Sequence, residues 1–82
     1  MPIPLVTRIL IADDHPIVRS GLRKVLDAMS DLEVVAEAED GAQAVERALE
    51  ENVDLAILDV SMPRLTGIQA AAELHKRRPD IK

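Results

Sequence analysis

Two patterns of apolar residues alternate along the chain: short apolar runs, and longer segments in which apolar residues recur at helical spacing. They predict short buried strands separated by amphipathic helices. Short runs made almost entirely of apolar residues, at 8–12 ("RILIA"), 34–36 ("VVA") and 55–58 ("LAIL"), are typical of strands covered on both faces. After each run, apolar residues recur at helical spacing. The order strand–helix therefore occurs three times, which predicts an α/β domain built on a parallel sheet.

The expected helices carry recognisable start and stop signals. Pro16 suits the first position of a helix, where its missing N–H is not needed. The pairs Asp40/Gln43 and Thr66/Gln69 have the spacing of a capping box. Pro79 is expected to end the last helix near Arg78.

Each predicted helix has an apolar stripe expected to face the sheet. The three stripes, in chain order, are Val18, Leu22, Val25, Leu26 and Met29; Ala42, Val45, Ala48 and Leu49; and Ile68, Ala71, Ala72 and His75. The right-handed crossover rule places the first helix on one face of the sheet and the second and third on the other. Helices on both faces are therefore expected.

Two of the predicted strands end in carboxylates, the first at Asp13 and Asp14 and the third at Asp59. Ligands of open parallel sheets bind beyond the carboxyl ends of the strands, where the strand order reverses. In a flavodoxin-like order, 2-1-3-4-5, this reversal lies between the first and third strands. If the chain follows that order, the three acids meet at one point.

Carboxylates this close must be neutralised in some way. Two like charges about 4 Å apart repel by roughly 4 kcal/mol at an effective dielectric constant of 20. Either one acid stays protonated, or a cation joins them. Mg²⁺ prefers such oxygen ligands and commonly accompanies phosphate, and a carboxylate can itself attack phosphorus. The simpler alternative is that these acids cap helices or solvate loops, and Asp14 lies close enough to the Pro16 helix to do so.

Composition narrows the classes of function. The chain has 82 residues, of which 48% are hydrophobic, enough for one small domain whose core contains no aromatic residue. Its 10 basic and 15 acidic residues give a net charge of −5, which disfavours direct nucleic-acid contact. No cysteine is present, so disulfides and thiolate sites are excluded. No signal peptide or membrane-length apolar run occurs, and a cytoplasmic location is expected.

Three stretches, "IADDHPIVRSGL", "EDGAQAV" and "LDVSMPRLTG", closely resemble the receiver domain of two-component response regulators. The stretches "DDHP" and "VVAEAEDG" are most similar to the NarL/FixJ group, whose output is a LuxR-type helix-turn-helix. The resemblance runs from about Arg8 to the end of the chain. It implies the flavodoxin-like fold, here with strand order 2-1-3 truncated from 2-1-3-4-5.

The resemblance also implies a role for each residue that matches the family's motif. Asp59 would accept a phosphoryl group from a histidine kinase, and Asp13 and Asp14 would hold Mg²⁺, with Asp14 the closer ligand. Asp59 itself and the backbone carbonyl of Ser61 would complete the protein's share of the metal site. The motif's proline and glycine, which shape the neighbouring loop, correspond to Pro63 and Gly67. Such a domain is a switch that assists its own phosphorylation and dephosphorylation, not a conventional enzyme.

His15 follows the acid pair directly and is the residue most open to misinterpretation. Histidine carries phosphoryl groups elsewhere in these pathways, but the acceptor of the family is the aspartate. Contact with a kinase, or a plain role at the start of the helix, is the expectation for His15.

The chain departs from the family in its length. Receivers have five strand–helix units, and three are recognisable here, with "RPDIK" resembling the approach to a fourth strand. Residues 1–82 are therefore expected to be a partial receiver without an output domain, and DNA contact is expected only through a C-terminal domain outside this chain. An uncovered third strand and an apolar patch on the first sheet face would favour self-association or domain swapping.

Two other functions remain open on the sequence. A pseudo-receiver, or protein-binding module, would keep the fold without transferring phosphate. An aspartate-nucleophile phosphatase of the haloacid dehalogenase type also carries its nucleophile after a strand, but such enzymes have a second acid two residues later. Ser61 occupies that position here.

Overall fold

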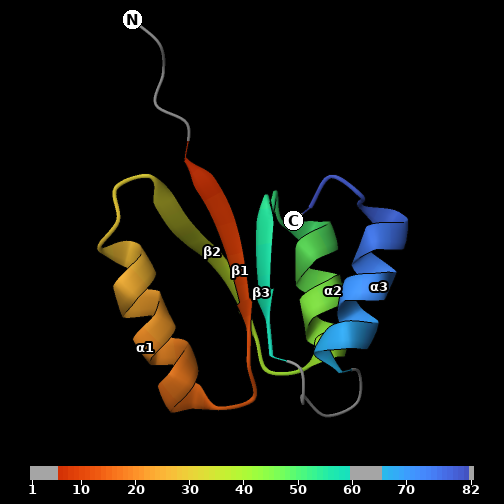
Figure 1. The fold of residues 1–82 in the computed structure, drawn as a ribbon, viewed down its shortest axis with the longest axis horizontal. Coiled ribbons are helices and arrows are strands. Elements are labelled where there is room, and N and C mark those ends of the chain that lie inside the picture. Colours follow the sequence, from red (N-terminus) through yellow and green to blue (C-terminus); the bar gives the residue numbers. More distant parts are fainter. Residues whose placement is uncertain (1–5, 60–65, 82) are drawn as a thin grey trace, which may run out of the picture.

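The computed structural model describes residues 6–59 and 66–81, which form three strands and three helices in strict alternation (Figure 1). The elements are β1 (Thr7–Ala12), α1 (Pro16–Asp27), β2 (Leu32–Ala38), α2 (Gly41–Glu50), β3 (Leu55–Leu58) and α3 (Gly67–Arg77). This order confirms the predicted α/β class. No helix in the described part of the chain is long and apolar enough to cross a membrane.

The strands form one parallel sheet in the order β2-β1-β3, which confirms the predicted flavodoxin-like arrangement. The last residue of β1, Ala12, pairs with Ala38 on one side and with Leu58 on the other. All three strands therefore end at the same level. The register between β1 and β2 shifts once, between Ile9 and Leu10 in the middle of β1.

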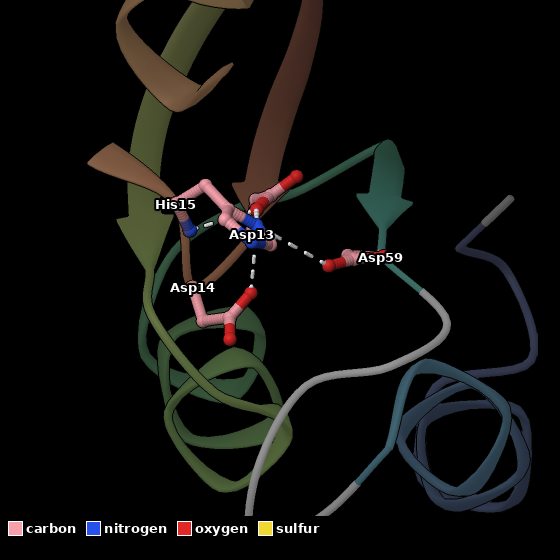
Figure 2. Close-up of side chains that lie close together, drawn as sticks. All are labelled: Asp13, Asp14, His15 and Asp59. Carbon is pink, nitrogen blue, oxygen red and sulfur yellow. Dashed lines mark hydrogen bonds and ion pairs between the residues drawn. The ribbon is translucent and has the colours of Figure 1, made fainter. Parts of the chain in front are cut away.

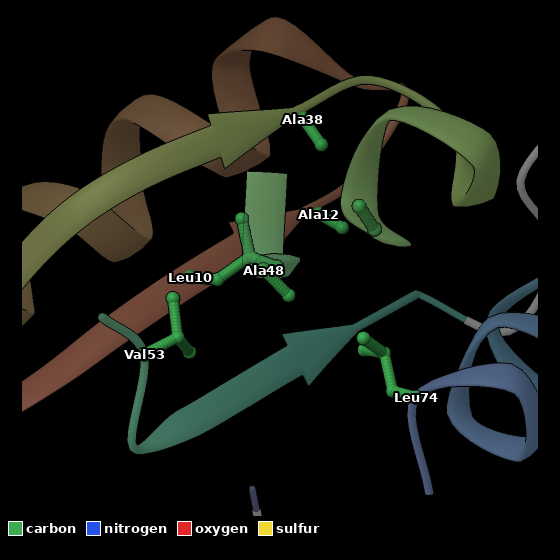
Figure 3. Packing of buried hydrophobic residues seen from close by; sticks show 7 residues of the cluster. Leu10, Ala12, Ala38, Ala48, Val53 and Leu74 are labelled. Atoms are coloured by element: carbon green, nitrogen blue, oxygen red, sulfur yellow. The ribbon is translucent and has the colours of Figure 1, made fainter. Parts of the chain in front are cut away.

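Each face of the sheet has its own apolar core. Figure 1 shows α1 alone on one face and α2 and α3 together on the other. The α1 face is built from Ile9, Ile11 and Val34, against which Leu22 and Leu26 pack. The other core, shown in part in Figure 3, consists of Leu10, Ala12, Ala38, Ala44, Ala48, Val53 and Leu74. The alternation of Ile9, Leu10 and Ile11 between the two faces explains why β1 is apolar at every position of its second half.

The helix boundaries follow the predicted signals. Pro16 is the first residue of α1, and α3 ends at Arg77, just before Pro79. Thr66 and Gln69 form a complete, reciprocal capping box at α3. At α2 the Asp40 side chain accepts from the Gln43 backbone N–H, but the Gln43 side chain accepts from the Glu39 N–H and not from that of Asp40.

The predicted buried stripe of α3 is wrong. Ile68, Ala71, Ala72 and His75 are all exposed, and the buried residues are Gly67, Ala70 and Leu74. Two stripes on α3 satisfy helical spacing, and the structure buries the one that begins with two small residues. Small side chains suit this position because α3 packs against α2, whose buried residues are also small: Gly41, Ala44 and Ala48.

The predicted stripes of α1 and α2 are correct only in part. Leu22 and Leu26 of α1 and Val45 and Ala48 of α2 contact the cores. The remaining members are exposed: Val18, Val25, Met29, Ala42 and Leu49. Because α1 is the only described helix on its sheet face, its flanks have no neighbouring helix to pack against, which agrees with the apolar patch expected there.

A matched pair of substitutions tests the core assignment. Ile11→Ala is expected to lower the free energy of unfolding by about 2 to 5 kcal/mol, because it removes a fully buried side chain from the centre of the sheet. Ile17→Ala, at a side chain that is 87% exposed, is expected to change it by less than about 0.5 kcal/mol. Urea denaturation monitored by circular dichroism measures both, and equal losses would contradict the assignment.

Candidate metal centre

Backbone pairing beyond the ends of the strands brings two acids to adjacent positions. The Asp13 N–H donates to the Ala38 carbonyl at 3.0 Å, and the Asp59 N–H donates to the Ala12 carbonyl at 2.9 Å. The sheet ladder thus continues for one residue past β1 and β3. Asp13 and Asp59 are separated by 46 positions in sequence but lie at the same edge because their strands are parallel neighbours.

Four side chains converge at this edge: Asp13, Asp14, His15 and Asp59 (Figure 2). One potential ligand atom from each lies within 4.8 Å of every other. The structure therefore brings together all three acids at the place where the sequence analysis expected them to meet. It adds His15, which the sequence analysis did not assign to this cluster.

The His15 ring nitrogen Nδ1 occupies the middle of the cluster. It lies 2.8 Å from Asp13 Oδ1, 2.9 Å from Asp14 Oδ1 and 3.9 Å from Asp59 Oδ2. Figure 2 shows the three carboxylates approaching it from different directions. The sequence signal was present, since His15 follows the acid pair directly, but the orientation of its ring cannot be obtained from residue spacing.

The start of α1 shows that Asp14 is not a helix cap. The N-cap residue is His15, and its side chain makes no capping hydrogen bond. Its backbone N–H instead donates to Asp13 Oδ1 at 2.8 Å, which holds the tight turn after β1. The alternative in which Asp14 caps this helix is therefore wrong, and its carboxylate faces His15 instead.

Arg19 supports the turn from α1 and was also missed by the sequence analysis. Its guanidinium donates to the Asp13 backbone carbonyl at 2.8 Å and to Glu37 Oε1 at 3.3 Å. Glu37 also pairs with Arg23. Arg19 thus connects the end of β1 to β2, and its positive charge lies close to the acids. The position of Arg19, one helical turn after His15, can be recognised in the sequence, but its contact with Glu37 on β2 cannot.

Two pKa values at the cluster are displaced by these contacts. Burial alone would raise the pKa of Asp13, but the hydrogen bonds from the His15 backbone and ring outweigh it and hold the pKa below its ordinary 3.8. The hydrogen bond to Asp13, followed by the charge of Asp14, raises the pKa of His15 above its ordinary 6.5. Metal-free protein therefore favours anionic Asp13 beside cationic His15.

The donor set fits a divalent cation. Three carboxylates supply the oxygen ligands that Mg²⁺ prefers, and a partly exposed site at a sheet edge leaves room for waters. Ser61 and Pro63, two of the predicted site residues, lie outside the described part of the chain. Gly67 is buried and is the first residue of α3.

Known proteins match this chain over most of its length. The family model described as "Response regulator receiver domain" matches residues 9–82. The transcriptional regulatory protein DegU of Brevibacillus brevis is 40% identical over 75 residues, which cover 92% of this chain and 32% of that protein. Other curated relatives include the response regulator GacA of Pseudomonas viridiflava and the oxygen regulatory protein NreC of Staphylococcus epidermidis, and the chain spans about a third of the length of each.

Solved structures show the same fold. The signal receiver domain of a NarL response regulator from Mycobacterium tuberculosis superposes with a TM-score of 0.91 at 35% identity, covering 96% of this chain and 64% of that one. RcsB from Salmonella enterica, solved on promoter DNA with a phosphomimetic, gives 0.84 at 32% identity, covering 93% and 64%. The similarity to NarL-type and LuxR-type regulators predicted from "DDHP" is thereby confirmed.

The raised pKa of His15 can be measured directly. In protein free of divalent cations, NMR titration of the ring is expected to give a pKa above 6.5, and Asp14→Asn is expected to lower it. A group whose pKa rises on folding stabilises the fold fully below its unfolded pKa, and loses that effect as the pH rises through its folded pKa. This part of the stability is therefore fully present below pH 6.5 and is lost as the pH rises through the higher pKa of the folded protein.

Asp31→Asn, at an exposed acid on the turn before β2, is the control and should leave the His15 titration unchanged. A His15 pKa at or below 6.5 in the unsubstituted protein would contradict the contacts seen at the cluster.

Proposed function

Because the chain belongs to the response regulator receiver domain family, we propose that it is a phosphoacceptor switch that takes a phosphoryl group on Asp59. The observation that carries the proposal is the meeting of Asp59 with Asp13 and Asp14, acids from a neighbouring strand, at the carboxyl edge of the sheet. Phosphoryl transfer requires a positioned nucleophile and neutralised charge, and this arrangement is suited to both.

Asp59 is the proposed nucleophile because it is held at its backbone and remains partly accessible. Its N–H is bonded to β1, and its side chain is 22% exposed. One carboxylate oxygen forms the new bond to phosphorus while the bond from phosphorus to the donor's histidine nitrogen breaks. The electron pair of that bond stays on the nitrogen, so a donor ring that is protonated on its other nitrogen is released as a neutral imidazole, and Asp59 becomes an acyl phosphate.

Asp13, Asp14, Asp59 and the Ser61 carbonyl are the proposed Mg²⁺ ligands. The bound ion would neutralise charge on the phosphoryl oxygens as they approach three carboxylates. Asp13 is the most firmly held member, since its carbonyl accepts from Arg19 and its carboxylate accepts from the His15 backbone. Pro63 and Gly67 are proposed to shape the loop that follows Asp59.

The proposal also covers the role of the whole protein, beyond residues 1–82. We infer a cytoplasmic partial receiver, spanning residues 1–82, whose phosphoryl donor is a histidine kinase. DegU is named a transcriptional regulatory protein, and RcsB was solved on promoter DNA, which supports DNA binding through a further C-terminal domain. The segment itself has a net charge of −5, so direct nucleic-acid contact is not proposed for it.

The pseudo-receiver is the alternative that an experiment must separate from the switch, because it would share the same fold. The phosphatase alternative is weaker, because Ser61 stands where those enzymes have their acid. Of these candidate functions, only the switch would have the domain assist its own phosphorylation and dephosphorylation.

Phosphorylation by a small donor tests the switch. Incubation with Mg²⁺ and acetyl phosphate is expected to add one phosphoryl group, detected by intact mass, and Asp59→Asn is expected to abolish the adduct. The side-chain amide introduced by that substitution cannot form the acyl phosphate. Asp31→Asn removes an equal charge from an exposed turn and should leave the adduct in place.

An adduct that persists in Asp59→Asn would place the phosphoryl group on another residue. No adduct in any variant, with each folded by circular dichroism, would favour the pseudo-receiver.

Self-association is the second proposal about this segment. Within the described residues β3 pairs on one side only, with β1, and α1 leaves Ile17, Val18 and Val25 exposed. Sedimentation equilibrium is expected to show a dimer or larger species. A cooperatively melting monomer would show that neither the strand edge nor the apolar patch needs a partner.

A further inference from the structure

Arg19 links the turn that carries two of the proposed ligands to the neighbouring strand. Its Nη1 donates to the Asp13 carbonyl at 2.8 Å, and its Nε donates to Glu37 Oε1 at 3.3 Å. That carbonyl belongs to the peptide bond between Asp13 and Asp14. The contact therefore restrains the peptide plane that joins the two acids.

This contact continues the hydrogen bonding of the sheet at the point where β2 stops. The Asp13 N–H still donates to the carbonyl of Ala38, which is the last residue of β2. The donor to the Asp13 carbonyl is then a side chain of α1. Asp13 is buried, and a buried carbonyl without a partner would cost free energy. Arg19 thus holds the main chain of Asp13 immediately before the turn.

Arg23, one helical turn later, shows what an ordinary ion pair on the same helix looks like. It pairs with Glu37 and with Asp27, and its side chain is 48% exposed. The Arg19 side chain is only 20% exposed, and it bonds to the main chain of Asp13 as well as to Glu37. Exposed ion pairs contribute little to stability, whereas the rigid fork of a guanidinium can hold two acceptors in a fixed geometry. The two arginines therefore share an acid but differ in what they restrain.

We propose that Arg19 is a positioning residue for the cation at this site, held in place by Glu37. By restraining the peptide between Asp13 and Asp14, it keeps both carboxylates directed at the point where they meet Asp59. This role rests on the proposed function, because it takes these acids to be ligands of the cation. Replacing a residue that orients metal ligands commonly weakens binding of the metal by about tenfold to a hundredfold.

Replacing Arg19 by methionine separates geometry from charge. Loss of a positive charge near three acids would by itself tighten cation binding. The proposed role predicts the opposite, so Arg19→Met is expected to weaken Mg²⁺ binding by about tenfold in isothermal titration. Arg23→Met is the matched control, because it removes the same charge and a contact with the same Glu37 but leaves the Arg19 bond to Asp13 in place. Its Mg²⁺ affinity should stay within about twofold of that of the unsubstituted protein.

Hydrogen exchange at the His15 amide gives a second readout, in protein without metal. This N–H donates to Asp13 Oδ1, so its exchange reports on the turn itself. Arg19→Met is expected to speed the exchange by at least about fivefold relative to Arg23→Met. Circular dichroism verifies that each variant is folded. If Arg19→Met does not fold, Arg19→Lys takes its place, since it keeps the charge without the planar fork and is expected to weaken Mg²⁺ binding at least about threefold.

The outcomes distinguish this role from the phosphoacceptor function. Equal Mg²⁺ affinities in the Arg19 and Arg23 variants, or equal exchange at the His15 amide, would overturn the positioning role and leave phosphorylation of Asp59 unaffected. Weaker Mg²⁺ binding and faster exchange in the Arg19 variant alone would support it. The same result in a protein that gains no adduct from acetyl phosphate would support the positioning role and overturn the phosphoacceptor function.

Discussion

The repulsion among three carboxylates held within 4.8 Å is the constraint on which the rest of this structure depends. At about 4 Å each pair costs roughly 4 kcal/mol at an effective dielectric constant of 20, and Asp13 is also buried. A loop free to move would relieve this by letting the side chains diverge into water. Here the freedom of two of them is restricted, because the backbones of Asp13 and Asp59 are bonded to adjacent strands.

The scaffold around the acids both creates the repulsion and compensates for it. β1 is paired on both sides, and its apolar residues alternate between two cores, so its carboxyl end has little freedom. The positive groups come from α1 and the turn that precedes it. His15 reaches all three acids with one nitrogen, and Arg19 approaches Asp13 through its carbonyl. The acids come from the sheet, and the compensating cations come from the segment packed against it.

Residue spacing was sufficient to predict the elements of this fold, because hydrophobic period and helix caps are local properties. The strand order needed more, since it depends on which strands pair, and it entered through the flavodoxin-like family. The apolar stripe of α3 was wrong because spacing alone does not distinguish Ile68 and His75 from Ala70 and Leu74. Only packing against α2 decides which side is buried. The site was likewise predictable only in part. The strand order brings the acids at the ends of β1 and β3 together, and this could be predicted. The positions of the His15 ring and the Arg19 guanidinium could not, because they depend on side-chain rotamers and on a partner in β2.

The simpler alternative, in which these acids merely solvate loops, does not account for the geometry. Asp13 is only 8% exposed, whereas a solvating carboxylate would extend into water. The hydrogen bond from the His15 N–H would explain the burial of Asp13 as part of a local turn. A local turn, however, does not require Asp59, an acid that follows another strand. Asp59 reaches the same point because of the register between β1 and β3, which local turn preferences do not determine. The convergence is thus a property of the tertiary fold, at the edge where open parallel sheets bind their ligands, and it is the basis of the proposal that these charges serve to hold a cation.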